Sequence, residues 1–279
     1  MQYRRLVRMN AMSQPAKTLG PGDRPVPARS RRAVALAAGV LVLAVLAAYW
    51  NTFSAPFVFD DVPGILENTS IRRLWPPLTV LLPPPDSGSP AGRPVVNLSI
   101  AINYAIGGTD VRGYHALNLV VHVLAALALF GIVRRTLRLR SGQALERFAG
   151  AQTCCALEDD GPSKSASLPA DALAFAVAVL WMLHPLQTES VTYVMQRTEL
   201  LGGLFYLLTL YCFIRATDAG TSHYWQAGCV GSCLLGMASK EIMASAPLVV
   251  WLYDRTFVSG SFRAAWQRHR RLYLALGST

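Results

Sequence analysis

The sequence AVALAAGVLVLAVLAAYW, from Ala33 to Trp50, contains 18 residues without a charge. A helix needs about 20 mainly apolar residues to cross the hydrocarbon core of a bilayer. Ten residues after this run come two adjacent acids, Asp60 and Asp61. Neighbouring carboxylates just outside a membrane helix repel each other and are costly to desolvate, which favours a functional site over a packing role. The sequence therefore predicts a membrane helix followed by a candidate site.

The composition extends this prediction to the whole chain. Its 279 residues are 52% hydrophobic and 15% charged, which is typical of an integral membrane protein. We predict an all-α, multi-pass transmembrane bundle of about six or seven spans. A seventh span is predicted to begin at Leu272. The other six predicted spans are Ala33 to Trp50, Ala116 to Val133, Ala172 to Leu183, Leu200 to Ile214, Tyr224 to Ser239 and Ile242 to Tyr253.

The net charge of +10 is distributed unevenly between the segments that join these spans. Basic residues favour the cytoplasmic side of a membrane protein. The asymmetry therefore predicts a cytoplasmic N-terminus, a site that faces the periplasm of a bacterial inner membrane, and no nucleic-acid partner. Of the 26 Lys and Arg residues, the predicted outer segments contain only Arg72, Arg73, Arg93, Arg112, Arg197 and Lys240.

The chain divides into a tail and one predicted membrane domain. Residues 1–32 contain eight basic side chains and several prolines, and they predict a disordered cytoplasmic tail. Residues 33–279 form the predicted transmembrane domain. It includes an external loop over 51–114, with an interfacial helix over Val95 to Ile106, and a polar cytoplasmic insertion over 134–171.

Two further segments bring charges to the predicted outer surface. The stretch HPLQTESVTYVMQRTELL, from His184 to Leu201, predicts a short amphipathic surface helix with Glu189 and Gln196 on one face. Ser239 to Glu241 join the last two predicted spans without a loop, which places Lys240 and Glu241 at the membrane edge. The outer interface therefore collects a set of candidate site residues. They are Asp60, Asp61, Arg93, Glu189, Arg197, Glu199, Lys240 and Glu241.

Such a set suits the chemistry of a lipid-linked sugar phosphate. Arg and Lys side chains at the membrane edge can hold the phosphate and stabilise the charge that develops on it, a role that Arg93, Arg197 and Lys240 could fill. A hydroxyl acceptor is a weak nucleophile and needs a carboxylate to remove its proton. Asp60 or Asp61 can be that base.

Several motifs carry a resemblance to a known family. They are FVFDD (Phe57 to Asp61), GRPVVNLSIAINYAIGG (Gly92 to Gly108), GYHALNLVVH (Gly113 to His122), HPLQTESVTYVMQRTELL and SKEIMASAPLVVWLYD (Ser239 to Asp254). Together they resemble the membrane part of the transmembrane and tetratricopeptide-repeat O-mannosyltransferases and their bacterial relatives, over roughly Tyr49 to Asp254. That family belongs to the polyprenyl-phosphate-sugar-dependent glycosyltransferases of the type C fold.

The resemblance implies an inverting transfer of a mannose-like sugar from a polyprenyl-phosphate donor to a protein or glycan hydroxyl outside the cytoplasm. It implies that Asp60 is the base, with Asp61 beside it. It implies no cofactor and leaves the use of a divalent metal open. The family has more spans than this chain and carries tetratricopeptide repeats, so we expect a fragment or a truncated relative. The other matching positions are Arg93, His184, Glu189, Arg197, Glu199 and Lys240.

Simpler roles compete with each of these assignments. The acid pair could cap a helix or lie solvated in a loop, and Arg93 could anchor a headgroup. Lys240 and Glu241 could pair with each other or snorkel. Glu189 and Arg197 could form a solvated helix face, and His184 could order the helix break before Pro185. Asn68 and Asn97 begin Asn-x-Ser/Thr sequons. The rival functions are a non-catalytic membrane scaffold and a transporter, although a transporter favours charges near the midplane and duplicated halves.

Overall fold

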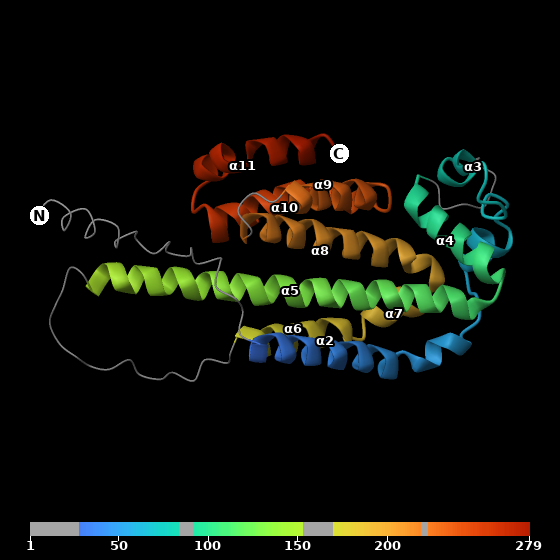
Figure 1. Ribbon diagram of the computed structural model, residues 1–279. Coiled ribbons are helices and arrows are strands. Elements are labelled where there is room, and N and C mark those ends of the chain that lie inside the picture. Colours follow the sequence, from blue (N-terminus) through green and yellow to red (C-terminus); the bar gives the residue numbers. More distant parts are fainter. Residues whose placement is uncertain (1–27, 84–91, 153–169, 219–222) are drawn as a thin grey trace, which may run out of the picture.

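The computed structural model describes residues 28–83, 92–152, 170–218 and 223–279, and these ranges contain helices and no strands (Figure 1). The prediction of an all-α fold is confirmed. The α-helices are α2 (Ala28–Ala48), α3 (Pro77–Leu81), α4 (Pro94–Gly107), α5 (Val111–Gln152), α6 (Ala170–Met182), α7 (Gln187–Thr192), α8 (Arg197–Asp218), α9 (His223–Met237), α10 (Ala246–Tyr253) and α11 (Phe262–Gly277). Short 3-10 or π segments are Trp50–Ser54, Val62–Leu66, Val194–Gln196, Glu241–Ser245 and Asp254–Val258.

The longer helices run side by side, and the short helices α3, α4 and α7 gather at one end of the bundle (Figure 1). Helix α5 packs against α2, α6 and α8, and α8 packs against α9. We call the end that carries α3, α4 and α7 the α4 end. The opposite end, where α8 and α10 finish and α11 begins, is called the basic end, because it contains Arg134, Arg135, Arg138, Arg215, Arg255 and Arg263.

Two helical stretches among the described residues, Val111–Arg140 and Val194–Asp218, are long and apolar enough to cross a membrane. Three shorter apolar helices accompany them, at Arg32–Ala48, Pro94–Gly107 and Ala170–Met182. The number of spans therefore stays a prediction. The helix predicted at Val95 to Ile106 is present as α4.

Helix α5 extends to Gln152, well beyond the predicted end of its span at Val133. This extension lies in the region predicted as a polar insertion, and it contains no proline and many strong helix formers. At its start, Arg134 Nε donates to Asp171 Oδ1 over 2.8 Å and Arg138 bonds the same carboxylate, which joins α5 to α6. Residues 1–27 and 153–169 lie outside the described residues, so the tail and the rest of the insertion stay predictions.

Helix α11 begins at Phe262, ten residues before the predicted seventh span. Its first turns are amphipathic and basic, so a search for an apolar run does not detect them. The backbone leaves helical geometry at His269, with φ −122° and ψ 19°. The helix therefore has a basic first half and an apolar second half with a kink between them.

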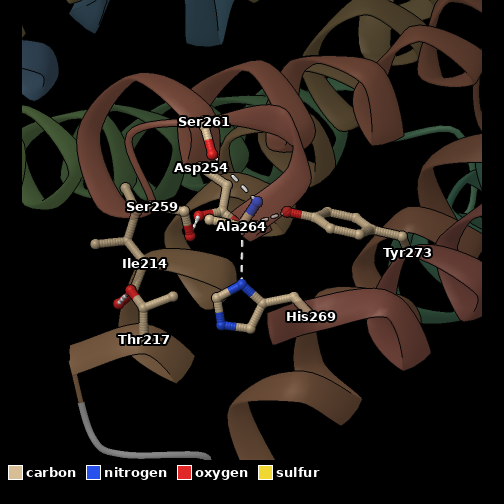
Figure 2. A network of polar contacts seen from close by, with 8 residues as sticks. All are labelled: Ile214, Thr217, Asp254, Ser259, Ser261, Ala264, His269 and Tyr273. Atoms are coloured by element: carbon tan, nitrogen blue, oxygen red, sulfur yellow. Dashed lines mark hydrogen bonds and ion pairs between the residues drawn. The ribbon is translucent and has the colours of Figure 1, made fainter. Parts of the chain in front are cut away.

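The kink lies beside a buried carboxylate at the basic end. Asp254 is fully buried and accepts hydrogen bonds from Ser259 Oγ at 2.7 Å and from the Tyr273 hydroxyl, and its Oδ2 lies 2.7 Å from His269 Nδ1. Figure 2 shows His269 and Tyr273 of α11 pointing toward this carboxylate. Burial alone would raise the pKa of Asp254, but the contacts with His269, Tyr273 and Ser259 outweigh it and hold the pKa below its ordinary value. The network therefore fixes α11 against the end of α10.

We expect Asp254→Asn to lower the free energy of unfolding by about 2–3 kcal/mol at pH 7, because the amide cannot satisfy the same three neighbours. A depressed carboxylate pKa contributes stability above the unfolded-state pKa of about 3.9, and that stability is lost as the pH falls through the folded-state pKa. The difference between the two proteins should therefore shrink below about pH 4. Detergent-titrated unfolding at several pH values measures it. Asp110→Asn, at an exposed acid, is the control and should change little; a pH-independent difference would argue against the carboxylate's role.

Candidate functional site

The two acids of the predicted site occupy different environments at the α4 end. Asp61 is only 1% exposed, and its carboxylate accepts hydrogen bonds from the backbone N–H of Val58 at 3.1 Å and of Met195 at 2.8 Å. Burial raises the pKa of Asp61, although these backbone hydrogen bonds oppose the shift. Asp61 therefore joins the external loop to the segment that precedes α8.

Asp60 is exposed, in contrast to its neighbour. Its backbone N–H donates to the Tyr193 hydroxyl over 3.0 Å. Burial of the tyrosine and the nearby carboxylates of Asp60 and Asp61 raise the pKa of Tyr193. The contact positions the Asp60 main chain. The Asp60 side chain lies beside the same hydroxyl and is exposed, so Asp60 is the acid of the pair that can reach a substrate.

Phe59 precedes Asp60 in a strained conformation. Its φ of +47° lies in the left-handed region that phenylalanine rarely adopts, and its side chain is 84% exposed. The ring meets Tyr193 edge-to-face with the centroids 6.4 Å apart. Strained backbone is often retained at functional sites because it presents a neighbouring group in one direction. No periodicity or composition argument indicated Phe59, since its signal is a backbone angle.

Arg197 is completely buried, and its guanidinium is bonded within the protein. Its Nε donates to Asn118 Oδ1 at 2.7 Å, one terminal nitrogen donates to Asn103 Oδ1 at 2.7 Å, and the other donates to the carbonyl of Tyr114 at 3.0 Å. These bonds connect the start of α8 with α4 and α5. Arg197 therefore holds the α4 end together and presents no free donor edge to solvent.

Asn118 extends the same network toward the acids. Its amide nitrogen lies 3.4 Å from the Val191 and Val194 carbonyls and 3.5 Å from that of Tyr193. One polar framework thus runs from α4 through Arg197 and Asn118 to the segment bonded by Asp61. Sequence reasoning missed Asn118 and Asn103 because amides inside apolar helices carry no spacing signal.

The remaining candidate cations pair with acids at the same end. Lys240 forms an ion pair with Glu199 in the first turn of α8. A terminal guanidinium nitrogen of Arg93 lies 3.6 Å from Glu241 Oε1. The side chain of Arg93 is 34% exposed, and its buried Nε has no hydrogen-bond partner among the described residues. The backbone N–H of Val95 donates to the Ala238 carbonyl at 3.2 Å, which brings the start of α4 next to the end of α9. Of the three candidate cations, Arg93 and Lys240 therefore have donors near the surface, whereas Arg197 does not.

His184 and Glu189 make local contacts. His184 Nδ1 accepts the backbone N–H of Leu186 at 3.2 Å, which fits its alternative role at the helix break. The surface helix predicted from His184 to Leu201 is interrupted, because α7 ends at Thr192 and Tyr193 adopts an extended conformation. Glu189 and Gln196 still meet, with the amide nitrogen of Gln196 3.4 Å from Glu189 Oε1.

Both sequon asparagines are inaccessible in the folded protein. Asn68 and Asn97 are fully buried, and the Asn68 amide nitrogen donates to Asn97 Oδ1 over 3.1 Å. The Asn97 amide nitrogen in turn donates to the carbonyl of Val80 at 2.7 Å. These amides are used to pack α3 and the external loop onto α4.

Among the residues that the structure describes, no group of three or more His, Cys, Asp or Glu side chains is arranged to hold a metal ion. Neither the predicted pair Asp60 and Asp61 nor any other acid here therefore forms a recognisable metal centre within the described ranges. The α4 end instead offers an exposed carboxylate, Asp60, and two cations near the surface, Arg93 and Lys240.

Comparison with known proteins relates the chain to one group of enzymes. It is 29% identical to protein O-mannosyl-transferase Tmtc3 of Drosophila melanogaster over 214 residues, which cover 72% of this chain and 22% of the relative. It is 30% identical to Drosophila Tmtc2 over 251 residues, which cover 82% of this chain and 22% of the relative. Human TMTC3 is 27% identical over 67% of this chain and 18% of its own length.

No protein-family model matches the chain, and no solved structure matches it. The chain spans about a fifth of the length of the curated relatives that it matches. Seen from this chain, the similarity to several of these enzymes covers most of its residues. The chain is therefore a homologue, over part of their length, of the TMTC protein O-mannosyl-transferases.

Proposed function

We propose that this chain forms the reacting part of a membrane glycosyltransferase. In this proposal a mannose-like sugar passes from a polyprenyl-phosphate donor to a hydroxyl acceptor on a protein or glycan, with inversion at the anomeric carbon. The names of the homologous enzymes support the reaction class. The single observation that carries the assignment of the site is the exposed Asp60 carboxylate on a loop fixed by Asp61.

Asp60 acts as the general base in the proposed mechanism. Its carboxylate accepts the proton of the acceptor hydroxyl while the hydroxyl oxygen forms a bond to the anomeric carbon. The bond between that carbon and the phosphate oxygen breaks, and polyprenyl phosphate leaves with the electron pair. Phe59 and Tyr193 hold the main chain of Asp60 in place, and Asp61 anchors the loop.

Arg93 and Lys240 hold the donor phosphate in the proposal. The unpartnered Nε of Arg93 supports this role, since a buried N–H without a partner gains most from an anionic ligand. Glu199 and Glu241 hold the two cations in position, and the donor phosphate then replaces these glutamates as their partner. Arg197 acts through the framework and does not contact the donor. His184 and Glu189 are proposed to shape the surface where the acceptor approaches.

The proposal places the α4 end outside the cytoplasm and the basic end inside it, in a bacterial inner membrane. The excess of basic residues at one end supports this orientation. Transfer is tested with the chain in lipid nanodiscs, labelled polyprenyl-phosphate mannose and a Ser- and Thr-rich peptide. We expect label in the peptide. Absence of any turnover would favour the scaffold role instead. Donor hydrolysis without peptide labelling would contradict the peptide as the acceptor.

Lys240→Gln should raise the KM for the polyprenyl-phosphate donor about tenfold, because one charge-assisted contact to phosphate is lost. Initial rates over a range of donor concentrations measure it. The matched control is Arg112→Gln, which removes an exposed cation from the same end of the bundle. Equal changes in KM for the two variants would mean that general surface charge, and not a contact with Lys240, attracts the donor.

A further inference from the structure

A second candidate binding site lies between α10 and α11, away from the segment that carries Asp60, and it extends from the first turn of α10 toward the basic end. A pocket of about 200 Å³ opens between α10 and α11, and it is lined by Pro247, Leu248, Trp251, Trp266 and Tyr273. Its lining is apolar and aromatic, but Trp251 brings one polar atom. The Trp251 indole nitrogen is buried and has no hydrogen-bond partner among the described residues. A buried donor without a partner favours a ligand that carries an acceptor.

The wall of this pocket is held by the Asp254 network. The Tyr273 ring lines the pocket while its hydroxyl donates to Asp254 (Figure 2). Trp266 stacks on Tyr273 with the ring centroids 6.1 Å apart and the planes 6° from parallel. Trp266 nevertheless stays 47% exposed. The pocket is thus a built feature with a fixed inner wall and an open aromatic side.

Exposed cations lie where α10 ends and along the first half of α11. The Arg255 guanidinium lies over the ring of Phe262, 5.1 Å from its centroid. The Phe262 ring packs against the Trp251 ring, with the two centroids 4.7 Å apart. This chain of contacts brings the Arg255 guanidinium close to the pocket. Arg263 follows Phe262 directly, and both arginines are exposed with no ion pair to a described carboxylate. Further along the same helix, Arg268, Arg270 and Arg271 are also exposed.

We propose that this pocket binds an anionic phospholipid of the bilayer in which the basic end lies. An apolar pocket beside exposed aromatic rings suits an acyl chain and its ester region, where an indole N–H donates to a carbonyl or phosphate oxygen. Arg255 and Arg263 then contact the negatively charged phosphate. Unpaired arginines at a membrane surface attract anionic headgroups by about 1 kcal/mol each, which a zwitterionic lipid does not reproduce.

The test uses the purified 279-residue chain in detergent, titrated with dioleoyl phosphatidylglycerol and, separately, dioleoyl phosphatidylcholine, with native mass spectrometry to count bound lipids. We expect phosphatidylglycerol to bind at least about tenfold more tightly. The variant R255Q/R263Q should lose about 10- to 30-fold in affinity for phosphatidylglycerol. Leu248→Trp fills the pocket without changing charge and should also weaken binding.

The matched control is R73Q/R112Q, which removes the same charge from exposed positions at the α4 end and should bind as the unchanged protein does. An equal loss of phosphatidylglycerol affinity in this control would mean that net charge alone attracts the lipid, which would overturn the proposed site. Unchanged affinity in R255Q/R263Q and in Leu248→Trp would overturn it as well. Competition by soluble glycerol 3-phosphate at the same concentration would mark a free anion site instead of a lipid site. Because no sugar transfer is measured, the result is independent of the proposed glycosyltransferase function.

Discussion

Asp60→Asn is expected to reduce the rate of sugar transfer by about 1000-fold, because a general base contributes roughly 100- to 10,000-fold and an amide cannot accept the proton. The substitution keeps the size of the side chain. It also leaves the backbone contact with Tyr193 in place, since that bond uses the main-chain N–H of residue 60. The protein should therefore fold and enter the membrane normally. The measurement is the initial rate of peptide labelling at saturating polyprenyl-phosphate mannose, together with thermal unfolding of the same sample.

Glu67→Gln is the matched control for this experiment. Glu67 is an exposed acid on the same external loop, seven residues after Asp60. Its substitution removes the same charge from the same region and should leave the rate within about twofold, as expected for a surface change away from the reacting atoms. If Asp60→Asn retained transfer, or if Glu67→Gln lost it equally, the base would have to be sought elsewhere.

Arg197→Met is expected to lower the free energy of unfolding by about 3–5 kcal/mol, the size of effect seen when one partner of a buried charged network is removed. The methionine fills much of the volume but leaves the side-chain oxygens of Asn103 and Asn118 without their donor. The cost arises from those unsatisfied buried groups. Because this framework also positions the loop that carries Asp60, transfer should fall as well. Unfolding in a titration with dodecyl sulfate measures the loss.

Arg73→Met provides the contrast, since Arg73 is exposed on the external loop and should change stability by less than about 0.5 kcal/mol. Arg197→Lys should recover only part of the stability, because an ammonium group cannot reproduce the planar fork that reaches two asparagines and a carbonyl. Full recovery by lysine would mean that charge alone matters. Wild-type stability in Arg197→Met would show that the framework carries little of the fold.

The helical class of the fold could be read from the sequence because apolar runs such as Ala33 to Trp50 have one stable solution in a membrane, a helix that satisfies its own backbone. The residues at which the helices begin and end were harder to predict from the sequence. Helix α5 continues to Gln152 through charged helix formers, and α11 begins at Phe262 with an amphipathic turn. In both cases the helix is polar where the prediction relied on apolarity.

The candidate site could be predicted as a set of residues but not as a set of roles. Asp60 and Asp61 are the same residue type at adjacent positions, and nothing in their spacing separates an exposed acid from a buried one. Lys240 and Glu199 are 41 positions apart and still form an ion pair. Arg197 was predicted beside the donor phosphate, yet its guanidinium is surrounded by Asn103, Asn118 and Tyr114.

The amino-acid sequence by itself determined the helical class, the gathering of charge at the ends of the spans and the relationship to the TMTC enzymes, because each depends on residue type and order along the chain. Only the tertiary structure decided which carboxylate is exposed, which arginine is buried and where the pocket beside Trp251 lies. The physical reason is that exposure and hydrogen-bond saturation depend on neighbours from distant segments. Two identical side chains acquire different chemistry when one meets the backbone of Met195 and the other meets solvent.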